Sequence, residues 1–572
     1  MGIPHLTRHL TPYAETVSLG QNSENTELCY LNSVVVDGPS LVYHVYHRLL
    51  ACMDPACEIW DVQPTCNEVS RGVVSFLSQL ASVGVKVERI CFDGALPVSK
   101  RITRLSRLEK SRSKLELCRR RPVTASTRQY RKELSIEPMR LWQGRSLPSR
   151  WKNMPENPFM VSAVLEDLLH RWTRKLALEE FPRDATLLPD TEYPWADITV
   201  IVPGEADVEC ARIARATGSA ILTSDSDLLL YDLGSGGSVV FLNSMQMIDN
   251  AENSARRELH AQRIHPCGLS HRLGIRNIQL FAYELKRHPQ IQFNELLRRS
   301  KAENDTKDHS VEYYDFLREY QHEPDHHSAT NEQISVRHLD PRVSELFWQF
   351  ESPGAYCVMD QPHVYLGILN EDHSRRCAWE QGRIYRSLGY SIHNIGRPML
   401  QRFSIVHEFV RRGGRIVAEP VTLAGEKTVV SDLVSLQERL DVARDLFDCE
   451  SMPRFWFLFA LAEIYRDPSN ATTVPNAKQL ECFLGNGFMG KGTEWAEIHL
   501  VAQVQAVLYS LRMLKQLLHK NADSDEFGQY RCLLVDLPPL YILMRSRHGI
   551  AQDFSEKESR RRAVHQMVRH YG

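Results

Sequence analysis

The sequence predicts an α/β fold with a central, mostly parallel sheet, followed by a mainly helical C-terminal domain. Three observations support this prediction. Short β-branched or apolar segments alternate with helical periodicity in the first 245 residues. Acidic residues follow four of these predicted strands. Beyond residue 336, long segments carry apolar residues at helical spacing. With 572 residues, the chain is long enough for two or three domains.

The first two predicted strands both end in Asp-Gly. Residues 34–38 read Val-Val-Val-Asp-Gly, and residues 85–94 end in Phe-Asp-Gly. A helical pattern over residues 69–80 lies between them and predicts a parallel β-α-β unit. We therefore expect Asp37 and Asp93 at the carboxyl edge of the sheet, where α/β proteins bind ligands.

Two further strands are each followed by a pair of acids. An apolar run ends at Pro203-Gly204, after which Glu205 and Asp207 open a predicted helix. The next strand, residues 220–223, is followed by Asp225 and Asp227. Since consecutive strands usually lie side by side, we expect both pairs at one sheet edge.

Carboxylates gathered at one edge repel one another in a low-dielectric cleft, and a hard divalent cation removes that conflict. A structural interpretation is also open. Acids are common at helix N-termini, where they complement the helix dipole, and Ser-Asp-Ser-Asp is also typical of a solvated turn.

Positive charge is concentrated directly after Asp93. Residues 100–150 contain sixteen Lys or Arg against four Glu, although the whole chain has a net charge of only −2. This asymmetry favours a polyanionic partner. The alternative is an ordinary solvated helix face. The basic residues at mixed i+3 and i+4 spacing are Lys100, Arg101, Arg104, Arg107, Lys110, Arg112 and Lys114.

The chain divides by composition into five predicted segments. Residues 243–300 are expected to be helical and irregular, and 301–335 are strongly polar, which predicts a linker. Long helices are predicted at 431–447, 454–465 and 495–519. The expected segments are 1–115 (first α/β region with the start of a basic arch), 116–194 (rest of the arch and an insertion), 195–300 (second α/β region), 301–335 (linker) and 336–572 (helical domain).

Several motifs resemble the XPG/flap-endonuclease superfamily. They are the initial Met-Gly-Ile, Val-Asp-Gly and Phe-Asp-Gly at the strand ends, Pro-Gly-Glu-Ala-Asp-x-Glu-Cys-Ala, and Thr-Ser-Asp-Ser-Asp. The last motif, together with the long helical C-terminal region, is similar to the Asteroid branch. The resemblance covers residues 1–115 and 195–245. It implies a PIN-like nuclease fold with two Mg²⁺ or Mn²⁺ ions for phosphodiester hydrolysis.

The same resemblance assigns roles to individual residues. Lys100 and Arg107 match the catalytic basic residues that reach the scissile phosphate from the arch. Gly2 matches the N-terminal glycine near the substrate, and Arg101, Arg104, Lys110, Arg112 and Lys114 are the further residues expected to contact nucleic acid. The expected metal-binding acids are Asp37, Asp93, Glu205, Asp207, Asp225 and Asp227.

The sequence departs from the family pattern in two places. The family's seventh acid has no clear counterpart, and Glu284 is the nearest candidate. The glycine-rich helix-two-turn-helix that grips duplex backbone is not recognisable. These departures leave cleavage polarity and substrate structure open.

The leading functional hypothesis is a metal-dependent, structure-specific endonuclease acting on branched or single-stranded DNA in repair, with RNA also possible as substrate. One alternative is a degenerate nuclease fold that serves as a scaffold for nucleic acid or a protein. Another is a Mg²⁺ enzyme acting on small substrates. The N-terminus lacks a signal-peptide apolar region, and no membrane span is expected. We expect the nucleus as its location, with the cytoplasm as the alternative.

Overall fold

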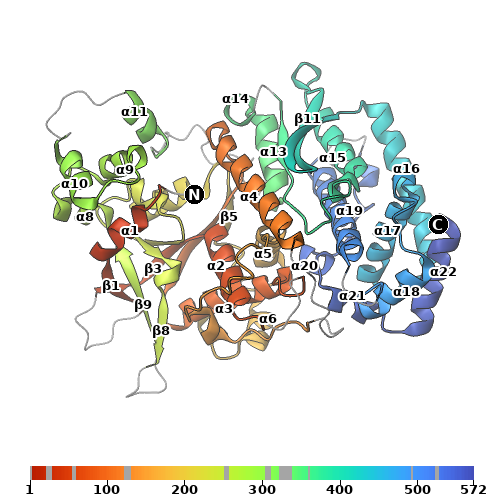
Figure 1. The fold of residues 1–572 in the computed structure, drawn as a ribbon, viewed down its shortest axis with the longest axis horizontal. Helices are drawn as coiled ribbons and strands as arrows, with labels where there is room; N and C mark the ends of the chain where they lie inside the picture. Colours follow the sequence, from red (N-terminus) through yellow and green to blue (C-terminus); the bar gives the residue numbers. More distant parts are fainter. Residues whose placement is uncertain are drawn as a thin grey trace.

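The computed structural model shows two lobes that lie side by side along the long axis of the molecule (Figure 1). The N-terminal lobe contains a curled, mostly parallel sheet with helices on both sides, and the C-terminal lobe is mainly helical. This confirms the predicted fold class. The structure describes residues 3–20, 29–54, 60–120, 131–249, 257–302, 311–320, 338–357, 361–490, 494–521 and 527–572.

Five parallel strands form the centre of the large sheet, in the order β7-β6-β3-β4-β5. Because they all run in one direction, their carboxyl ends meet at one edge. All four strands that the sequence predicts to precede acids are among them. The bounds, in spatial order, are Ser238–Phe241, Ala220–Thr223, Ser33–Asp37, Lys86–Asp93 and Thr199–Val202.

The expectation that the strands before the two acid pairs lie side by side is wrong. They are β5 and β6, and both β3 and β4 lie between them. The chain crosses back over the sheet through α7 (Ala206–Thr217) and adds β6 on the other side of β3. The sheet therefore has a topological switch point between β3 and β6, at the edge that carries the acids.

Antiparallel strands extend the sheet on the β7 side. β9 pairs antiparallel with β7, β1 and β8, whereas β1 pairs in parallel with β2. The prediction of a helical, irregular stretch over residues 243–300 is wrong for β8 and β9. In β9 the inward residues Leu259 and Ala261 alternate with polar ones, which gives a short and weak strand signal. The bounds are Glu15–Leu19 (β1), Cys29–Leu31 (β2), Gln246–Asp249 (β8) and Arg257–Ile264 (β9).

Helices cover both faces of the sheet. Val34 and Val36 of β3 belong to one apolar core and Val35 to the other, as alternation along a strand requires. The first core includes side chains of α2 (Gly38–Ala51), α3 (Cys66–Ser82), α5 (Met160–His170) and α6 (Arg174–Glu180). The second includes those of α1 (Leu6–Leu10), α7, α8 (Pro266–Leu273), α9 (Ile278–Arg287) and α10 (Phe293–Ala302).

The segment predicted as an arch remainder and insertion contributes to the core. Trp142, Trp151 and Trp172 are all buried in the first core. α5 and α6 are separate helices, because α5 ends at His170 and Thr173 caps α6 by accepting a hydrogen bond from Leu176 N (3.2 Å). Residues 131–198 are therefore an integral part of the N-terminal lobe.

Residues 301–335 are only partly consistent with a linker. They contain α11 (Val311–Arg318), and its Tyr313 and Phe316 are buried against the second core. The Tyr313 ring meets the Tyr283 ring of α9 edge-on, with 5.1 Å between centroids. Tyr313 and Phe316 stand at helical spacing within this polar stretch, and that spacing is the signal for α11, which composition alone does not show. Residues 311–320 therefore belong to the N-terminal lobe.

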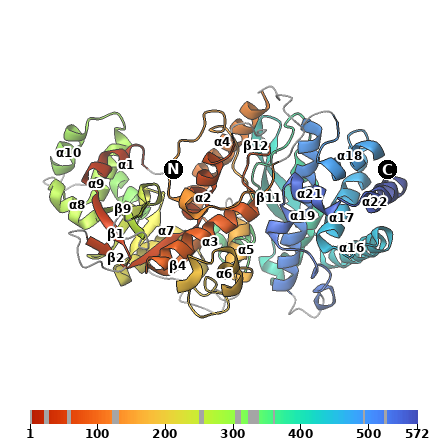
Figure 2. The same ribbon diagram turned by 90° about the horizontal axis from the view of Figure 1, so that it is seen from below.

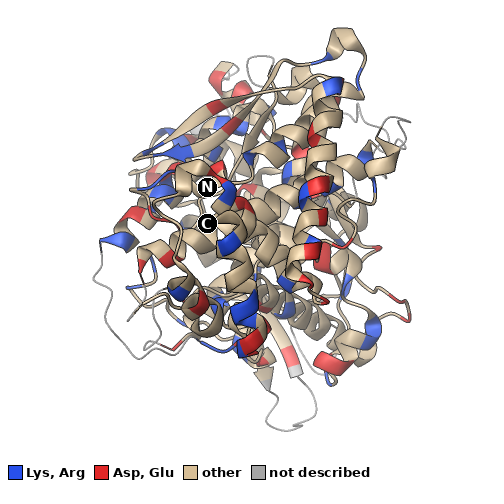
Figure 3. Cartoon of the chain, turned by 90° about the vertical axis from the view of Figure 1, so that its right-hand side faces the viewer, with Lys and Arg blue, Asp and Glu red and all other residues tan. Residues whose placement is uncertain are grey.

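The C-terminal lobe contains the three predicted long helices, each slightly longer than predicted: α16 (Glu426–Phe447), α17 (Met452–Arg466) and α19 (Trp495–Lys520). The other helices are α13 (Pro341–Glu351), α14 (Pro353–Tyr356), α15 (Arg383–Ile395), α18 (Ala477–Asn486), α20 (Leu540–Leu543), α21 (Arg547–Asp553) and α22 (Lys557–Tyr571). No described helix has the length and apolarity needed to cross a membrane. Lys and Arg are interspersed with Asp and Glu on the face of this lobe shown in Figure 3.

A small sheet that the sequence reading missed lies within this lobe. Its strands are β10 (His363–Tyr365), β11 (Ile405–Arg412) and β12 (Arg415–Thr422). The hairpin between β11 and β12 turns at Gly413, where φ is +56°. This sheet faces the N-terminal lobe, and the helix α4 (Arg101–Arg119) lies between the two lobes against it (Figures 1 and 2).

Acid should weaken the C-terminal lobe through His393 of α15. Its ring lies 4.8 Å from that of Phe350, and burial lowers its pKa to about 4. An unfolded histidine titrates near pH 6.5. Because the folded state disfavours protonated His393, the free energy of unfolding is highest above about pH 6.5 and decreases as the pH falls toward 4. The total decrease is about 3 kcal/mol. Urea unfolding between pH 7.5 and 5 should show a smaller pH dependence in His393→Gln, and an unchanged dependence would contradict this.

Candidate metal centre and nucleic-acid interface

All six predicted acids line one cavity at the carboxyl edge of the sheet. Its volume is about 840 Å³. The acids reach it from the ends of β3, β4 and β6 and from the start of α7, after β5. The predicted set that the fold brings together is Asp37, Asp93, Glu205, Asp207, Asp225 and Asp227.

The Asp-Gly endings of β3 and β4 have a steric cause. A Cβ added at Gly38 would lie 2.7 Å from the Phe92 ring, and one at Gly94 would lie 1.8 Å from Val202 O. Glycine therefore follows each acid because the next strand or its side chains approach too closely for any other residue. The acids and the close strand packing are parts of one arrangement.

Local hydrogen bonds orient the acids of the central strands. Asp37 caps α2 by accepting from Ser40 N (3.2 Å), and it also accepts from the Thr223 hydroxyl (2.7 Å). Asp93 accepts from Ala206 N at the start of α7 (2.7 Å). These bonds connect the end of β3 to the end of β6, and the end of β4 to the start of α7.

The acids after β6 are held in a similar way. Asp225 N bonds to the Thr223 hydroxyl (2.9 Å), and the Asp225 carboxylate accepts from Asp227 N (3.0 Å). Asp227 accepts from Ile3 N (3.1 Å), so the start of the chain packs against the site. Gly2, predicted to lie near the substrate, is outside the described residues.

Burial and mutual repulsion make negative charge costly in this cavity. Burial raises the pKa of Asp37 to about 6, and the Asp93 carboxylate adds to this shift. Burial followed by Asp225 raises the pKa of Asp227 to about 6. The pKa of Asp207 is raised well above its usual value, first by burial and then by the surrounding carboxylates. A cation bound here would offset all of these costs.

The donor set fits a hard divalent cation, although the side chains do not form a closed metal cage. Within the described ranges, no three His, Cys, Asp or Glu side chains are gathered closely enough to hold a metal ion as they stand. Their oxygens instead accept the hydrogen bonds given above, and Glu205 pairs with Lys100 (3.4 Å). Carboxylate oxygens on rigid strand ends are what Mg²⁺ and Mn²⁺ prefer. The cavity acids are therefore the residues that would hold such an ion.

The opposite wall of the cavity is basic. It is formed by Lys100, which ends a short 3₁₀ turn, and by α4. Burial alone would lower the pKa of Lys100, but Glu205 and other carboxylates raise it overall. Arg107 and Lys110 are exposed, and neither has an ion-pair partner among the described residues. The basic residues between positions 100 and 119 that line the cavity are Lys100, Arg104, Arg107, Lys110 and Lys114.

Other predicted basic residues have intramolecular partners. The Arg101 guanidinium carbon lies 5.4 Å from the centroid of the Phe409 ring in β11. Arg112 pairs with Glu109 (2.7 Å) and Glu116 (3.0 Å) on its own helix. Neither Arg101 nor Arg112 lines the cavity. Arg104 and Lys114 do line it but pair with Glu345 and Glu156, respectively.

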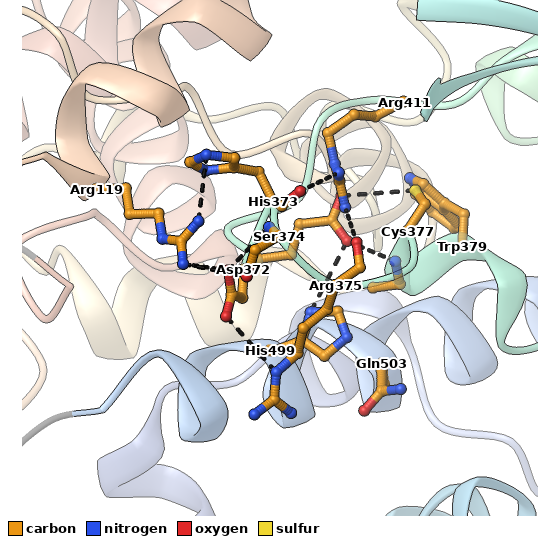
Figure 4. A network of polar contacts seen from close by, with 12 residues as sticks. Arg119, Asp372, His373, Ser374, Arg375, Cys377, Trp379, Arg411, His499 and Gln503 are labelled. Carbon is orange, nitrogen blue, oxygen red and sulfur yellow. Dashed lines mark hydrogen bonds and ion pairs between the residues drawn. The ribbon is translucent and has the colours of Figure 1, made fainter. Parts of the chain in front are cut away.

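The C-terminal lobe also holds the far end of α4 (Figure 4). Arg119 forms an ion pair with Asp372 (3.1 Å) and donates a hydrogen bond to the Ser374 hydroxyl (3.1 Å). The loop that carries Asp372 and Ser374 is itself held within the C-terminal lobe. The buried Arg411 pairs with Glu371 (2.7 Å) and donates to His373 O (3.0 Å). The C-terminal lobe therefore contacts α4 near both of its ends.

Removing the Asp372 carboxylate should weaken the contact between the C-terminal lobe and the end of α4. Asp372→Ala deletes the ion pair to Arg119 and should destabilise the last turns of α4 locally by about 1–2 kcal/mol. Amide hydrogen exchange there should accelerate about 5- to 30-fold, while exchange in β3 stays unchanged. The matched control is Asp441→Ala, an exposed acid paired at i+3 with Arg444. Equal exchange in the wild type and Asp372→Ala would show that the contact does not hold the helix.

The cavity includes functional candidates that the sequence reading missed. Tyr43 is 41% exposed and lines the cavity from α2, nearly two turns beyond the Asp37 cap. An aromatic residue on the polar face of that helix was the available signal. Lys286 and Glu319 form a pair (3.5 Å) at the cavity wall. Glu284, the candidate seventh acid, is buried in the core and does not line the cavity.

Comparison with known proteins gives one match. No curated protein and no solved structure matches the chain. A family model described as XPG domain containing matches residues 156–423, just under half of the chain. The match covers the acids after β5 and β6 and continues through the small sheet of the C-terminal lobe. It supports a place for this chain in the XPG/flap-endonuclease-like superfamily and a nuclease-type function.

Proposed function

We propose that the chain is a divalent-metal-dependent, structure-specific endonuclease of Asteroid type. It hydrolyses phosphodiester bonds in branched or single-stranded DNA. The observation that carries this proposal is the cavity itself, where six carboxylates face an open basic wall. Branched DNA arises in repair, so a role in repair and a nuclear location are part of the proposal.

The acidic and the basic residues of the cavity have different roles in the proposed reaction. The carboxylates hold Mg²⁺ or Mn²⁺, which would lower the pKa of an attacking water and offset charge on the leaving oxygen. Arg107 and Lys110 have no competing ion pair among the described residues, so they are free to bind the phosphates of the strand. Lys100 lies closest to the acids, 3.4 Å from Glu205, and stabilises charge that develops on the scissile phosphate.

The open basic wall favours a polymer over a small phosphate ester. A cavity of about 840 Å³ with several basic residues on one side is suited to a charged strand. Tyr43 offers a ring on which a base can stack. Binding should therefore weaken steeply as the salt concentration rises, as expected when phosphate contacts release counterions.

The test is cleavage of end-labelled splayed, 3′-overhang and 5′-flap DNA, with matched RNA and a small aryl phosphate, in Mg²⁺, Mn²⁺ or chelator. The wild type should cut DNA only with metal, and Asp225→Asn should be slower by at least about a hundredfold. The control Glu209→Gln changes an acid of α7 that does not line the cavity and should cut normally.

Two outcomes would overturn the proposal. If no substrate is cut although DNA binds equally well to the wild type and Asp225→Asn, the scaffold alternative replaces it. If the small phosphate is turned over faster than DNA at every salt concentration, the enzyme acts on small substrates.

A further inference from the structure

A pocket away from the acidic cavity, here called the interlobe pocket, lies where the two lobes meet. Its volume is about 120 Å³. The N-terminal lobe contributes Trp60 and residues 157–159, and the C-terminal lobe contributes residues of α19 and the turn that leads into α21. None of the six acids of the proposed metal centre is among its described lining residues. Small-ligand sites occur preferentially at such contacts between domains.

Two buried N–H groups at the interlobe pocket donate no hydrogen bond among the described residues. They are Trp60 Nε1 and Arg547 Nη1, and the Arg547 side chain is only 8% exposed. Buried donors without an acceptor are rare in native proteins, because desolvating them is unfavourable. Both groups can only donate. A ligand that satisfies them must therefore supply acceptor atoms.

The rest of the Arg547 guanidinium is already held in place. Nε and Nη2 both donate to Asp61 Oδ1 (3.2 and 2.9 Å), which connects α21 to the N-terminal lobe. Nη1 lies 3.7 Å from Glu497 Oε2, which is too far for a hydrogen bond. The Glu497 carboxylate accepts from backbone N–H groups and does not line the pocket. Arg547 therefore presents Nη1 in a fixed orientation.

The charged residues that line the interlobe pocket favour an anion. The three arginines Arg131, Arg545 and Arg547 outnumber the single acid Asp61. The acids that pair with Arg131 and Arg545 are not among the described lining residues. A cationic ligand is therefore disfavoured, and a carboxylate is favoured because arginine pairs strongly with carboxylate oxygens.

The size and the apolar side chains of the pocket limit the rest of the ligand. An apolar cavity of about 150 Å³ can hold a benzene molecule. A pocket of about 120 Å³ therefore suits one ring or a short aliphatic chain rather than a nucleotide. The apolar side chains that line it include Pro64, Phe159, Ile498, Val501 and Met544.

The pocket also borders the loop that contacts α4. Asn370 lines the pocket and donates to the Gln63 side chain of the other lobe (2.9 Å). Two residues further along, Asp372 pairs with Arg119 at the end of α4. A ligand here would contact both lobes beside this loop.

We propose that the interlobe pocket binds a small organic carboxylate. The carboxylate accepts hydrogen bonds from Arg547 and Trp60, and the apolar body of the ligand packs against Val501 of α19 and its apolar neighbours. This site is independent of the nuclease function proposed above, because it uses no residue of the acidic cavity.

The test compares three probes that differ only in the polar group on a fluorinated ring: 4-fluorobenzoate, 4-fluorobenzamide and 4-fluorobenzylamine. Each is titrated with the full chain in chelator and followed by fluorine NMR. 4-Fluorobenzoate should bind saturably with a Kd of roughly 1–10 mM, as expected for a ligand of about ten non-hydrogen atoms. The amide should bind at least about 10-fold more weakly and the amine more weakly still, because an ionised acceptor forms the stronger hydrogen bonds.

Three substitutions place the probe. Trp60→Phe keeps an aromatic ring but removes the N–H, so it should weaken 4-fluorobenzoate by about 10-fold or more. Val501→Phe fills the pocket and should abolish binding, whereas Val501→Thr keeps the volume and should bind like the wild type. Lys110→Ala is the control for the basic wall of the acidic cavity, the other place that attracts a carboxylate, and should leave the affinity unchanged.

Two results would overturn the proposal. One is equal affinity for the three probes, or no saturable binding of 4-fluorobenzoate up to about 50 mM. The other is binding that survives Trp60→Phe and Val501→Phe but is lost in Lys110→Ala, which would assign the probe to the acidic cavity. Thermal unfolding checks that each variant is folded, and Trp60→Phe decides the matter if Val501→Phe is not. None of these titrations depends on cleavage, so the nuclease function stands or falls separately.

Discussion

Asp207→Asn is expected to abolish cleavage and at the same time stabilise the metal-free protein. Among the described residues, Asp207 has no hydrogen-bond partner, and burial together with four neighbouring carboxylates raises its pKa well above the usual value. The substitution keeps the shape of the side chain and removes the charge. Because the lost carboxylate is a proposed metal ligand, the cleavage rate should fall at least about a hundredfold.

The sign of the stability change follows from two opposing effects. A negative charge in the first turn of α7 interacts favourably with the helix dipole by about 0.3–1 kcal/mol. Burial among other carboxylates is unfavourable and outweighs this, because the net pKa shift of Asp207 is upward. We therefore expect Asp207→Asn to raise the thermal unfolding midpoint in chelator by about 2 °C or more.

The matched control is Glu209→Gln on the same helix. Glu209 lies in the same turn but pairs with Arg212 (2.6 Å) outside the cavity. Its substitution should leave cleavage unchanged and alter stability by no more than about 0.5 kcal/mol. With Mg²⁺ present, the wild type should instead have a higher thermal unfolding midpoint than Asp207→Asn, because the ion stabilises the wild type more. A lower unfolding midpoint for Asp207→Asn in chelator would contradict the repulsion argument.

Arg386→Ala should cause the largest loss of stability in the C-terminal lobe. The Arg386 and Glu408 side chains are 1% and 2% exposed, and the guanidinium donates twice to that carboxylate, at 2.6 and 2.8 Å. Arg386 also donates to the Ser510 hydroxyl (2.8 Å) and to Trp379 O (2.9 Å). Removing it leaves a buried, unpaired carboxylate, which costs about 3–5 kcal/mol.

Urea unfolding followed by hydrogen exchange in α15 and α19 would measure this loss. The control is Arg383→Ala on the same helix, whose partly exposed pair with Glu419 (3.3 Å) should contribute at most about 1 kcal/mol. Arg386→Met/Glu408→Leu should be less destabilising than Arg386→Ala, because no charge is left unpaired. A loss below about 1 kcal/mol in Arg386→Ala would show that Glu408 finds another partner or water.

The acidic half of the site was predictable because it depends on local rules. An acid at the end of a parallel strand must lie at the carboxyl edge, and the sequence shows where these strands end. The last strand residues are Asp37, Asp93, Val202 and Thr223. This rule holds for any order of parallel strands, so the wrong expectation about β5 and β6 does not change where the acids lie. Fold class and long helices follow from apolar periodicity in the same way.

The other half of the site depends on contacts between distant segments, which periodicity does not encode. Arg104 reads as one more basic residue of a helix, but it pairs with Glu345, which is 241 positions away. The small sheet that contacts α4 was missed because β10 is only three residues long and β12 contains Pro420, which weakens a strand signal. A second cavity beneath α4, of about 290 Å³, is lined by residues of both lobes, so it could not be predicted from either one.

The central claim is that the six carboxylates hold divalent metal ions. Calorimetric titration of Mn²⁺ into the metal-free wild type and into Asp225→Asn/Asp227→Asn tests it without relying on catalysis. We predict saturable Mn²⁺ binding by the wild type and binding at least about 10- to 100-fold weaker in the double variant, with Glu209→Gln unchanged. Equal Mn²⁺ affinity in the wild type and the double variant would contradict the account.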